Sequence, residues 1–237
     1  MQPATTHQMM GYDRAINIFS PDGRLLQVEY AKKTVKRGST VIGITASDGV
    51  VIVADKRLVN DLVISDSLEK IALVDKHIAA SSAGIISDAR VLISYAQKVA
   101  QQHRVTYDSP VDVITVVREV ADVVQVYTQS GGLRPFGVSI MFAGFDSSPK
   151  LFIVDPTGIY FQYKACSIGE GEDECTEWLQ KHYKLVNTDE ALKMGVSAIK
   201  SFLKDNFSPE RLEAVIIKKE GIKILKGSEI EKIAKKV

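Results

Sequence analysis

Apolar runs, cysteines and excess charge are all scarce in this chain of 237 residues. No apolar run is long enough to span a bilayer, and residues 1–11 lack the apolar stretch of a secretion signal, so we expect a cytoplasmic protein with no membrane partner. The formal net charge of +1 gives no electrostatic case for a nucleic-acid partner. The two cysteines, Cys166 and Cys175, form no CxxC unit, and we expect reduced thiols with one or both in the core.

The usual residues of a metal or cofactor site are equally sparse. The four histidines are scattered and show no metal-ligand spacing with cysteine, which favours surface or capping histidines over a zinc site (His7, His77, His103 and His182). The glycines on either side of Glu170 suggest a phosphate loop, but the acids at 170–174 would repel a phosphate and suit the first turn of a helix instead. We therefore expect no metal and no cofactor.

What the chain does contain is an ordinary globular composition and a clear order of elements. The residues are 45% hydrophobic and 25% charged, with no linker, repeat or low-complexity block, which predicts one domain. Strand and helix patterns alternate in groups, which predicts layers around a mostly antiparallel sheet core. The expected strands are 39–45, 50–54, 71–74, 78–82, 138–144, 151–154, 159–163, 214–218 and 222–225, and the expected helices are 86–100, 113–127, 172–183 and 188–203.

Residues 12–36 are the most informative stretch. Residues 20–23 are typical of a turn, because proline presets one backbone angle and the pair AspGly tolerates unusual backbone angles. After this turn, apolar residues recur at helical spacing with lysines between them (Leu25, Val28, Ala31 and Val35). The pattern predicts a turn and an amphipathic helix, and periodicity alone fits an ordinary surface helix that packs on its own domain.

The amino-acid sequence of this stretch resembles the N-terminal signature of proteasome α subunits, most closely the archaeal form. The resemblance rests on TyrAspArg from residue 12, PheSerProAspGlyArg from residue 19, GlnValGluTyrAla from residue 27 and ArgGlySerThr from residue 37. Thr34 departs slightly, because related chains more often carry a smaller residue there, and we expect it at a solvated edge. Further matches continue in register at 52–57, 67–71, 82–85, 88–91, 134–139, 142–146, 155–158 and 168–171.

This resemblance implies a fold and a role. The fold is the N-terminal-nucleophile hydrolase type, an α+β fold of four layers in the order αββα. Residues 1–237 would form a single domain, with 1–11 as a flexible gate tail and 12–36 as a turn and helix ahead of the sandwich. Seven identical α subunits would close into a ring on a ring of β subunits, and the 24–35 helix would pack at the ring face, where its apolar stripe gains a partner surface.

The gate expectation has a symmetry argument behind it. Identical polar tails around one axis cannot all occupy the axis in the same ordered conformation, so we expect the tail to be mobile and to block bulky chains more than small peptides. The resemblance places gate contacts between neighbouring subunits, and as single residues their simpler interpretation is packing or turn formation. These gate residues are Tyr12, Asp13, Arg14, Pro21 and Tyr30.

The resemblance also points to a docking pocket for an activating ATPase that would deliver unfolded proteins. Lys70 would receive the C-terminal carboxylate of the ATPase, a known form of chain-end capture. Gly38 and Gly84 match residues that line this pocket, where the absence of a side chain lets a partner backbone approach. Outside the family context, a strand-edge lysine that limits aggregation is the simpler interpretation of Lys70.

A self-processing hydrolase remains the main alternative. Catalytic members of this fold expose Thr, Ser or Cys as residue one, and the free amine assists the side chain as nucleophile. Ser39 falls at that position, while Asp55, Arg57 and Lys70 fall where catalytic β subunits keep an acid, an arginine and a lysine. The segment before Ser39 matches what α subunits retain, so we expect that the chain is non-catalytic. The third hypothesis is an α-like ring with no β partner.

Overall fold

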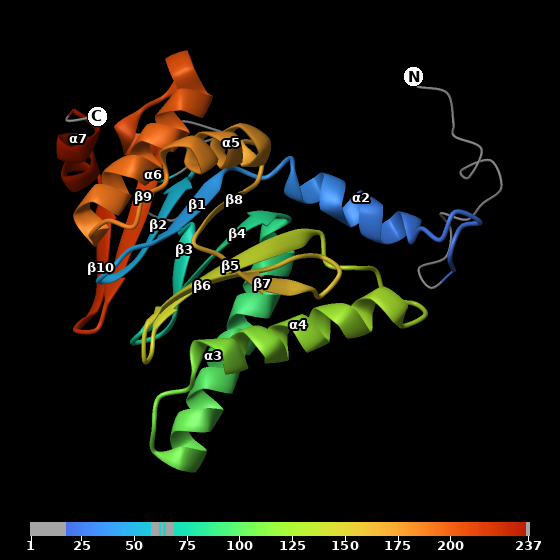
Figure 1. The fold of residues 1–237 in the computed structure, drawn as a ribbon. Coiled ribbons are helices and arrows are strands. Elements are labelled where there is room, and N and C mark those ends of the chain that lie inside the picture. Colours follow the sequence, from blue (N-terminus) through green and yellow to red (C-terminus); the bar gives the residue numbers. More distant parts are fainter. Residues whose placement is uncertain (1–17, 58–61, 63, 65–68, 236–237) are drawn as a thin grey trace.

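Two antiparallel sheets pack face to face in the computed structural model, which describes residues 18–57, 62, 64 and 69–235 (Figure 1). Each sheet has five strands. The first sheet holds, in spatial order, β10 (Gly221–Lys226), β9 (Leu212–Lys218), β2 (Gly49–Asp55), β1 (Val41–Thr45) and β8 (Ala165–Ile168). The second holds β3 (Ile71–Asp75), β4 (Ile78–Gly84), β5 (Val138–Phe145), β6 (Pro149–Val154) and β7 (Tyr160–Gln162).

Helices cover both outer faces of this pair of sheets (Figure 1). The second sheet is covered by α3 (Ile86–Tyr107) and α4 (Val113–Gln129), and the first by α5 (Glu172–His182), α6 (Thr188–Leu203) and the short α7 (Ser228–Ala234). Two 3-10 turns, η2 (Lys204–Asn206) and η3 (Pro209–Arg211), lead into β9. The expected αββα layers are confirmed. Among the described helices, none combines the length and the apolar character that crossing a membrane requires.

Strand alternation explains the three apolar layers of the core. Successive side chains on a strand point to opposite faces, so a strand between two covered faces is apolar throughout. In β2, Val51 and Val53 face the layer of α5 and α6, whereas Val50, Ile52 and Ala54 face the second sheet. A third layer lies between the second sheet and the pair α3 and α4, where Phe142 is fully buried.

Both cysteines lie in this core, as expected. Cys166 on β8 faces the space between the sheets, and Cys175 packs with α6 beneath the first sheet. Burial raises the pKa of the Cys166 thiol far above its ordinary value and raises that of Cys175 to about 12. Neither thiol is therefore a reactive thiolate at neutral pH.

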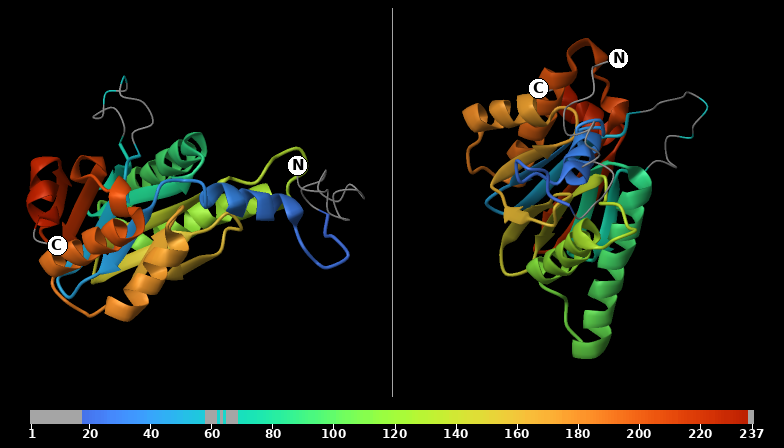
Figure 2. Two further views of the ribbon diagram at one scale, coloured as in Figure 1. Left: turned by 90° about the horizontal axis from the view of Figure 1, so that it is seen from above. Right: turned by 90° about the vertical axis from the view of Figure 1, so that its right-hand side faces the viewer.

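Helix α2 (Leu26–Val35) corrects one expectation about the N-terminal segment. Its buried residues are Leu26, Val28, Ala31 and Val35, so Leu26 takes the place predicted for Leu25. All four are buried within the single chain, where α2 lies against β4 and β5 and Val35 joins the core between the sheets. Figure 2 shows α2 in blue at one end of the sandwich, with the turn at 20–23 projecting beyond the sheets. The simpler interpretation of a surface helix on its own domain holds for the stripe itself.

Thr34 corrects a second expectation, because it does not lie at a solvated edge. Its side chain is partly buried, and its Oγ1 lies 2.7 Å from the carbonyl oxygen of Ala31 and 2.8 Å from that of Gly137. Ion pairs hold the cationic side of α2, with Lys32 3.0 Å from Asp155 and Lys36 2.9 Å from Asp173. The helix is thus fastened along both of its sides.

Most predicted elements are present, and the differences have local causes. Helix α3 runs to Tyr107, two turns beyond the predicted end. The prediction ended early because residues 101–107 are mostly exposed and carry no apolar stripe that would indicate a helix. Strand β8 was not predicted, and the strand expected at 159–163 is limited to Tyr160–Gln162. The acids at 172–174 do form the first turn of α5, as predicted. The stretch near the C-terminal end forms α7, which is not among the helices expected above.

Three glycines allow the backbones of different elements to touch where α2 leads into β1. A Cβ on Gly38 would overlap the backbone nitrogen of Gly84, and a Cβ on Gly84 would overlap the carbonyl oxygen of Gly137. Gly84 also has φ of +122°, which side-chain-bearing residues rarely adopt. The end of α2, the end of β4 and the start of β5 therefore meet without side chains between them.

We predict that Gly38→Ala destabilises the folded chain. The new methyl group meets rigid backbone of Gly84 and Ala83, and overpacking of this kind typically costs about 1–3 kcal/mol. Each kcal/mol lowers the melting temperature of a chain of this size by about 2–4 °C. Gly131→Ala is the matched control, because a Cβ there meets no atom within 4 Å. Equal melting temperatures for the two variants, at equal protein concentration, would contradict the predicted clash.

Candidate docking pocket

A cavity of about 530 Å³ lies between the ends of β2 and β3 and the first turns of α3. We call it the Lys70 pocket. Among the described residues of its lining are three cations and one acid, so these residues give it a positive character that favours an anionic group. The charged lining residues are Lys56, Lys70, Arg90 and Glu69, and the others are Ser39, Ala72, Ser82, Ile86, Ala89, Ile93, Ser94 and Gln97.

The backbone of Lys70 is held on both sides at the start of β3. Its N–H donates to Oε2 of the buried Glu213 at 2.9 Å, and its carbonyl oxygen accepts from the Ser81 hydroxyl at 2.8 Å. Burial lowers the pKa of the Lys70 ammonium to about 8, with Arg57 adding to the shift and Asp55 opposing it. The lysine is therefore fixed at its base and is already partly desolvated.

The ammonium itself has room for a partner. In the described part of the chain, no side chain forms a hydrogen bond or an ion pair with Lys70 Nζ. An ammonium offers three donors. A carboxylate that entered the pocket would supply acceptors that the described residues do not.

Gly38 and Gly84 lie next to this pocket and shape its edge. Gly38 directly precedes the lining residue Ser39, and Gly84 lies two residues before Ile86 at the start of α3. Their close backbone contact joins two of the segments that contribute residues to the wall. The three residues predicted for docking are thus gathered at one end of the sandwich.

Ser39 is an internal residue with an amide nitrogen, not an amine. The preceding peptide is anchored, since the Gly38 N–H donates to the Val35 carbonyl at 2.9 Å and the Gly38 carbonyl accepts from the Glu170 N–H at 2.8 Å. The general base of an N-terminal-nucleophile site, the free amine of residue one, is therefore not available at Ser39 in the intact chain.

Asp55, at the position of the catalytic acid, is already engaged. It is 2% exposed, and its two oxygens accept from Nε and an NH₂ group of Arg211 at 3.1 and 2.8 Å. The Arg57 N–H adds a bond of 3.0 Å, while the Arg57 guanidinium pairs with Glu170 instead. Arg211 was not predicted, because a partner 156 residues along the chain leaves no local pattern in the sequence.

The predicted gate residues are only partly visible. Tyr12, Asp13 and Arg14 lie outside the described residues. Pro21 is exposed within a turn closed by the bond from the Gly23 N–H to the Ser20 carbonyl at 2.8 Å. Tyr30 is half-buried on α2, with Lys33 Nζ 5.5 Å from its ring centroid.

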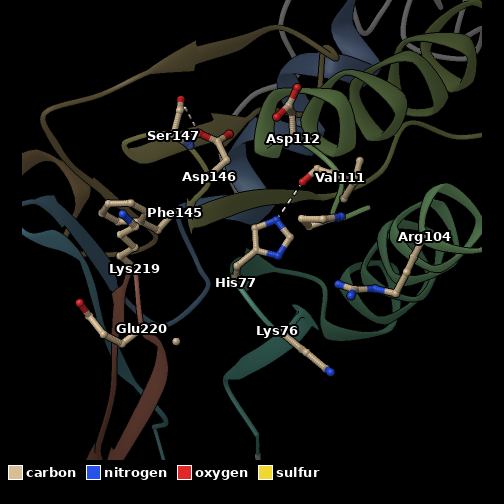
Figure 3. Close-up of a pocket in the computed structure, with 12 residues that line it drawn as sticks. Lys76, His77, Arg104, Val111, Asp112, Phe145, Asp146, Ser147, Lys219 and Glu220 are labelled. Atoms are coloured by element: carbon tan, nitrogen blue, oxygen red, sulfur yellow. Dashed lines mark hydrogen bonds between the residues drawn. The ribbon is translucent and has the colours of Figure 1, made fainter. Parts of the chain in front are cut away.

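A second cavity, of about 500 Å³, opens at the other end of β3 (Figure 3). Its polar groups serve mainly to join strand ends to helices. The His77 ring points toward the loop before α4, and its Nε2–H donates to the Val111 carbonyl at 2.8 Å. Asp146 accepts from the Val113 N–H at 3.2 Å and pairs with Lys150 at 2.9 Å. We assign no ligand to this cavity.

Two family models match this chain. The family model for proteasome subunits matches residues 35–217, and the model for the N-terminal signature of A-type proteasome subunits matches residues 12–33.

Three relatives, each named as an alpha subunit of the proteasome, match most of the chain. The protein from Picrophilus torridus is 50% identical over 211 residues, 88% of this chain and 90% of its own length. That from Archaeoglobus fulgidus is 47% identical over 210 residues, covering 88% and 85%, and that from Saccharolobus solfataricus is 50% identical over 199 residues, covering 83% of each. The chain therefore belongs to the proteasome subunit family, on its α-subunit branch.

Proposed function

We propose that this chain is a non-catalytic α subunit of a proteasome core, which forms the outer ring, gates substrate entry and docks an activating ATPase. The observation that carries the proposal is the Lys70 pocket, a positive cavity whose central ammonium pairs with no described side chain, in a chain of the proteasome α family. Its partners are six further copies in a seven-membered ring, a ring of β subunits that holds the active sites, and the unfolded proteins that pass through the gate. The particle would be cytoplasmic.

Two observations support a subunit without catalysis of its own. The nitrogen of Ser39 is tied up in a peptide bond, and the carboxylate of Asp55 is neutralised by Arg211. The alternative, a hydrolase that cleaves itself before Ser39, predicts an expressed chain shortened by residues 1–38. Intact mass spectrometry separates the two, because the α-subunit role requires the full chain to persist.

Docking is proposed to rest on charge and shape together. The C-terminal carboxylate of the ATPase pairs with Lys70. Gly38 and Gly84 act by holding the adjoining segments in close backbone contact, because the space that a side chain would occupy at each is filled by the chain's own backbone. The neighbouring cations, Lys56 and Arg90, strengthen the attraction. Docking would then act on residues 1–11, which block the entrance on the ring axis. The entrance would open when contacts rearrange at the gate residues, which are Tyr12, Asp13, Arg14, Pro21 and Tyr30.

We predict that Lys70→Ala abolishes stimulation of protein degradation by the ATPase and leaves ring assembly and basal peptide hydrolysis intact. Truncating one partner of a desolvated charge pair commonly costs about 2–5 kcal/mol, so affinity for the ATPase should fall by at least about tenfold. Lys70→Arg keeps the charge but changes its shape, and shows whether the pocket selects geometry as well. Lys193→Ala, at an exposed lysine of α6, is the control.

Deleting residues 2–11 completes this experiment. If the tail is the barrier and Lys70 is the receiver of the signal, the deletion should speed casein degradation equally in the wild-type and Lys70→Ala backgrounds. A Lys70→Ala particle that responds to the ATPase like wild type would show the docking assignment to be wrong. A deletion that leaves casein degradation slow would show that the tail is not the barrier.

Docking should also weaken as pH rises through about 8. Only the ammonium form of Lys70 pairs with a carboxylate, and its pKa in the empty pocket is about 8, so the paired form is favoured below this pH and progressively lost above it. Between pH 8 and 9.5 the affinity should fall by up to about tenfold per pH unit. Equilibrium binding of the ATPase, measured from about pH 6.5 to 9.5, checks this. Lys70→Ala should bind weakly with a flat profile, and a flat wild-type profile would contradict the prediction.

A further inference from the structure

The hydroxyl of Thr34 has one proton and two acceptors. Its Oγ1 lies 2.7 Å from the Ala31 carbonyl oxygen and 2.8 Å from the Gly137 carbonyl oxygen, both within the ordinary range for an O–H···O bond. Carbonyl oxygens only accept hydrogen bonds, so the single hydroxyl proton either is shared between the two carbonyls or bonds to one of them. One choice keeps the bond inside α2, and the other joins α2 to the segment before β5.

The Gly137 side of this choice is hydrogen-bonded to the first turn of α3, and that turn contributes residues to the Lys70 pocket. The Gly137 carbonyl also accepts from the Ile85 N–H at 2.9 Å, and the Gly137 N–H donates to the Asp88 carboxylate at 2.9 Å. Ile85 and Asp88 bracket the first turn of α3, and the residues beside them, Ile86 and Ala89, line the pocket. A displacement of this turn therefore acts on the atom that Thr34 contacts.

Changing acceptors leaves no buried group unsatisfied among these residues. If the proton moves to Ala31, the Gly137 carbonyl keeps its bond from Ile85, and the threonine bonds within its own helix as helix threonines commonly do. The two arrangements are therefore close in free energy, which makes this contact easy to bias from either side.

We propose that Thr34 is a positioning residue that couples α2 to the first turn of α3, so that occupation of the Lys70 pocket is transmitted to the N-terminal segment. The inference rests on the proposed docking function and goes beyond it by naming the contact that carries the signal. It requires a hydroxyl at this position, which threonine and serine supply and alanine and glycine do not.

Three variants in particles assembled with the β subunits test the coupling. Thr34→Val keeps the shape and removes the donor, whereas Thr34→Ser keeps the donor. Thr128→Val is the matched control, because the Thr128 hydroxyl also donates to a carbonyl three residues back, Gln125 at 2.7 Å, with no second acceptor among the described residues. The probes are the proteasome-activating ATPase of the same organism, its binding affinity at equilibrium, and casein degradation at saturating ATPase.

The proposal expects Thr34→Val to lower casein degradation at saturation by about three- to tenfold, the factor that one neutral hydrogen bond represents, while affinity for the ATPase changes less. Thr34→Ser and Thr128→Val should behave like wild type. Full stimulation of the Thr34→Val particle, or an equal loss in the Thr34→Ser or Thr128→Val particle, overturns the inference. A wild-type particle that ignores the ATPase overturns the proposed function as well, so the two failures are distinguishable.

Hydrogen exchange on the wild-type particle gives a second measurement that needs no variant. Bound ATPase should change the exchange of the Ile85 amide, which bonds to Gly137, of the amides in the last turn of α2, and of the Gly38 amide, which bonds to Val35 just after the helix. Protection that changes at Ile85 and not in α2 would show that the signal stops at the pocket, and would overturn the inference.

Discussion

Where Gly38 meets Gly84, two backbones touch with no side chain between them, and Gly84 meets Gly137 in the same way. This contact sets the path of the chain as it leaves α2 and enters β1, and it sets the start of α3 relative to both sheets. The Lys70 pocket lies between these same segments, so its shape depends on atoms that cannot move apart independently. The structural requirement for small residues at Gly38 and Gly84 therefore fixes the position of segments next to the proposed docking pocket.

A serine, an acid and a lysine stand in this chain where catalytic relatives of the fold keep their reactive groups, yet their surroundings are different. Ser39 follows an anchored peptide, Asp55 is bound by Arg211, and the Lys70 ammonium opens toward a cavity. Residue types alone do not define a site, because the chemistry depends on which atoms remain free. This end of the sandwich is where we propose that the chain end of a partner is recognised.

Local periodicity predicted the elements with a complete apolar face, such as α4, where Val116, Val120 and Val124 are all fully or almost fully buried. It missed β8, which has four residues, and the exposed end of α3. The order of the layers came from the family resemblance. The Asp55 pair with Arg211 and the Thr34 contact join residues more than 100 positions apart, and no pattern within one segment encodes them. The part of the gate expected at Tyr12, Asp13 and Arg14 lies outside the described residues.

Because both cysteines are buried, this chain should react very slowly with thiol reagents under native conditions. Alkylating dyes attack thiolates, and both sulfurs are buried among apolar side chains with strongly raised pKa values. A single cysteine introduced on the exposed surface would thus be the one accessible labelling site in each copy of the chain, without prior removal of native cysteines. In the proposed seven-membered ring this would give seven equivalent probe positions, a geometry well suited to distance measurements by fluorescence transfer or electron spin resonance.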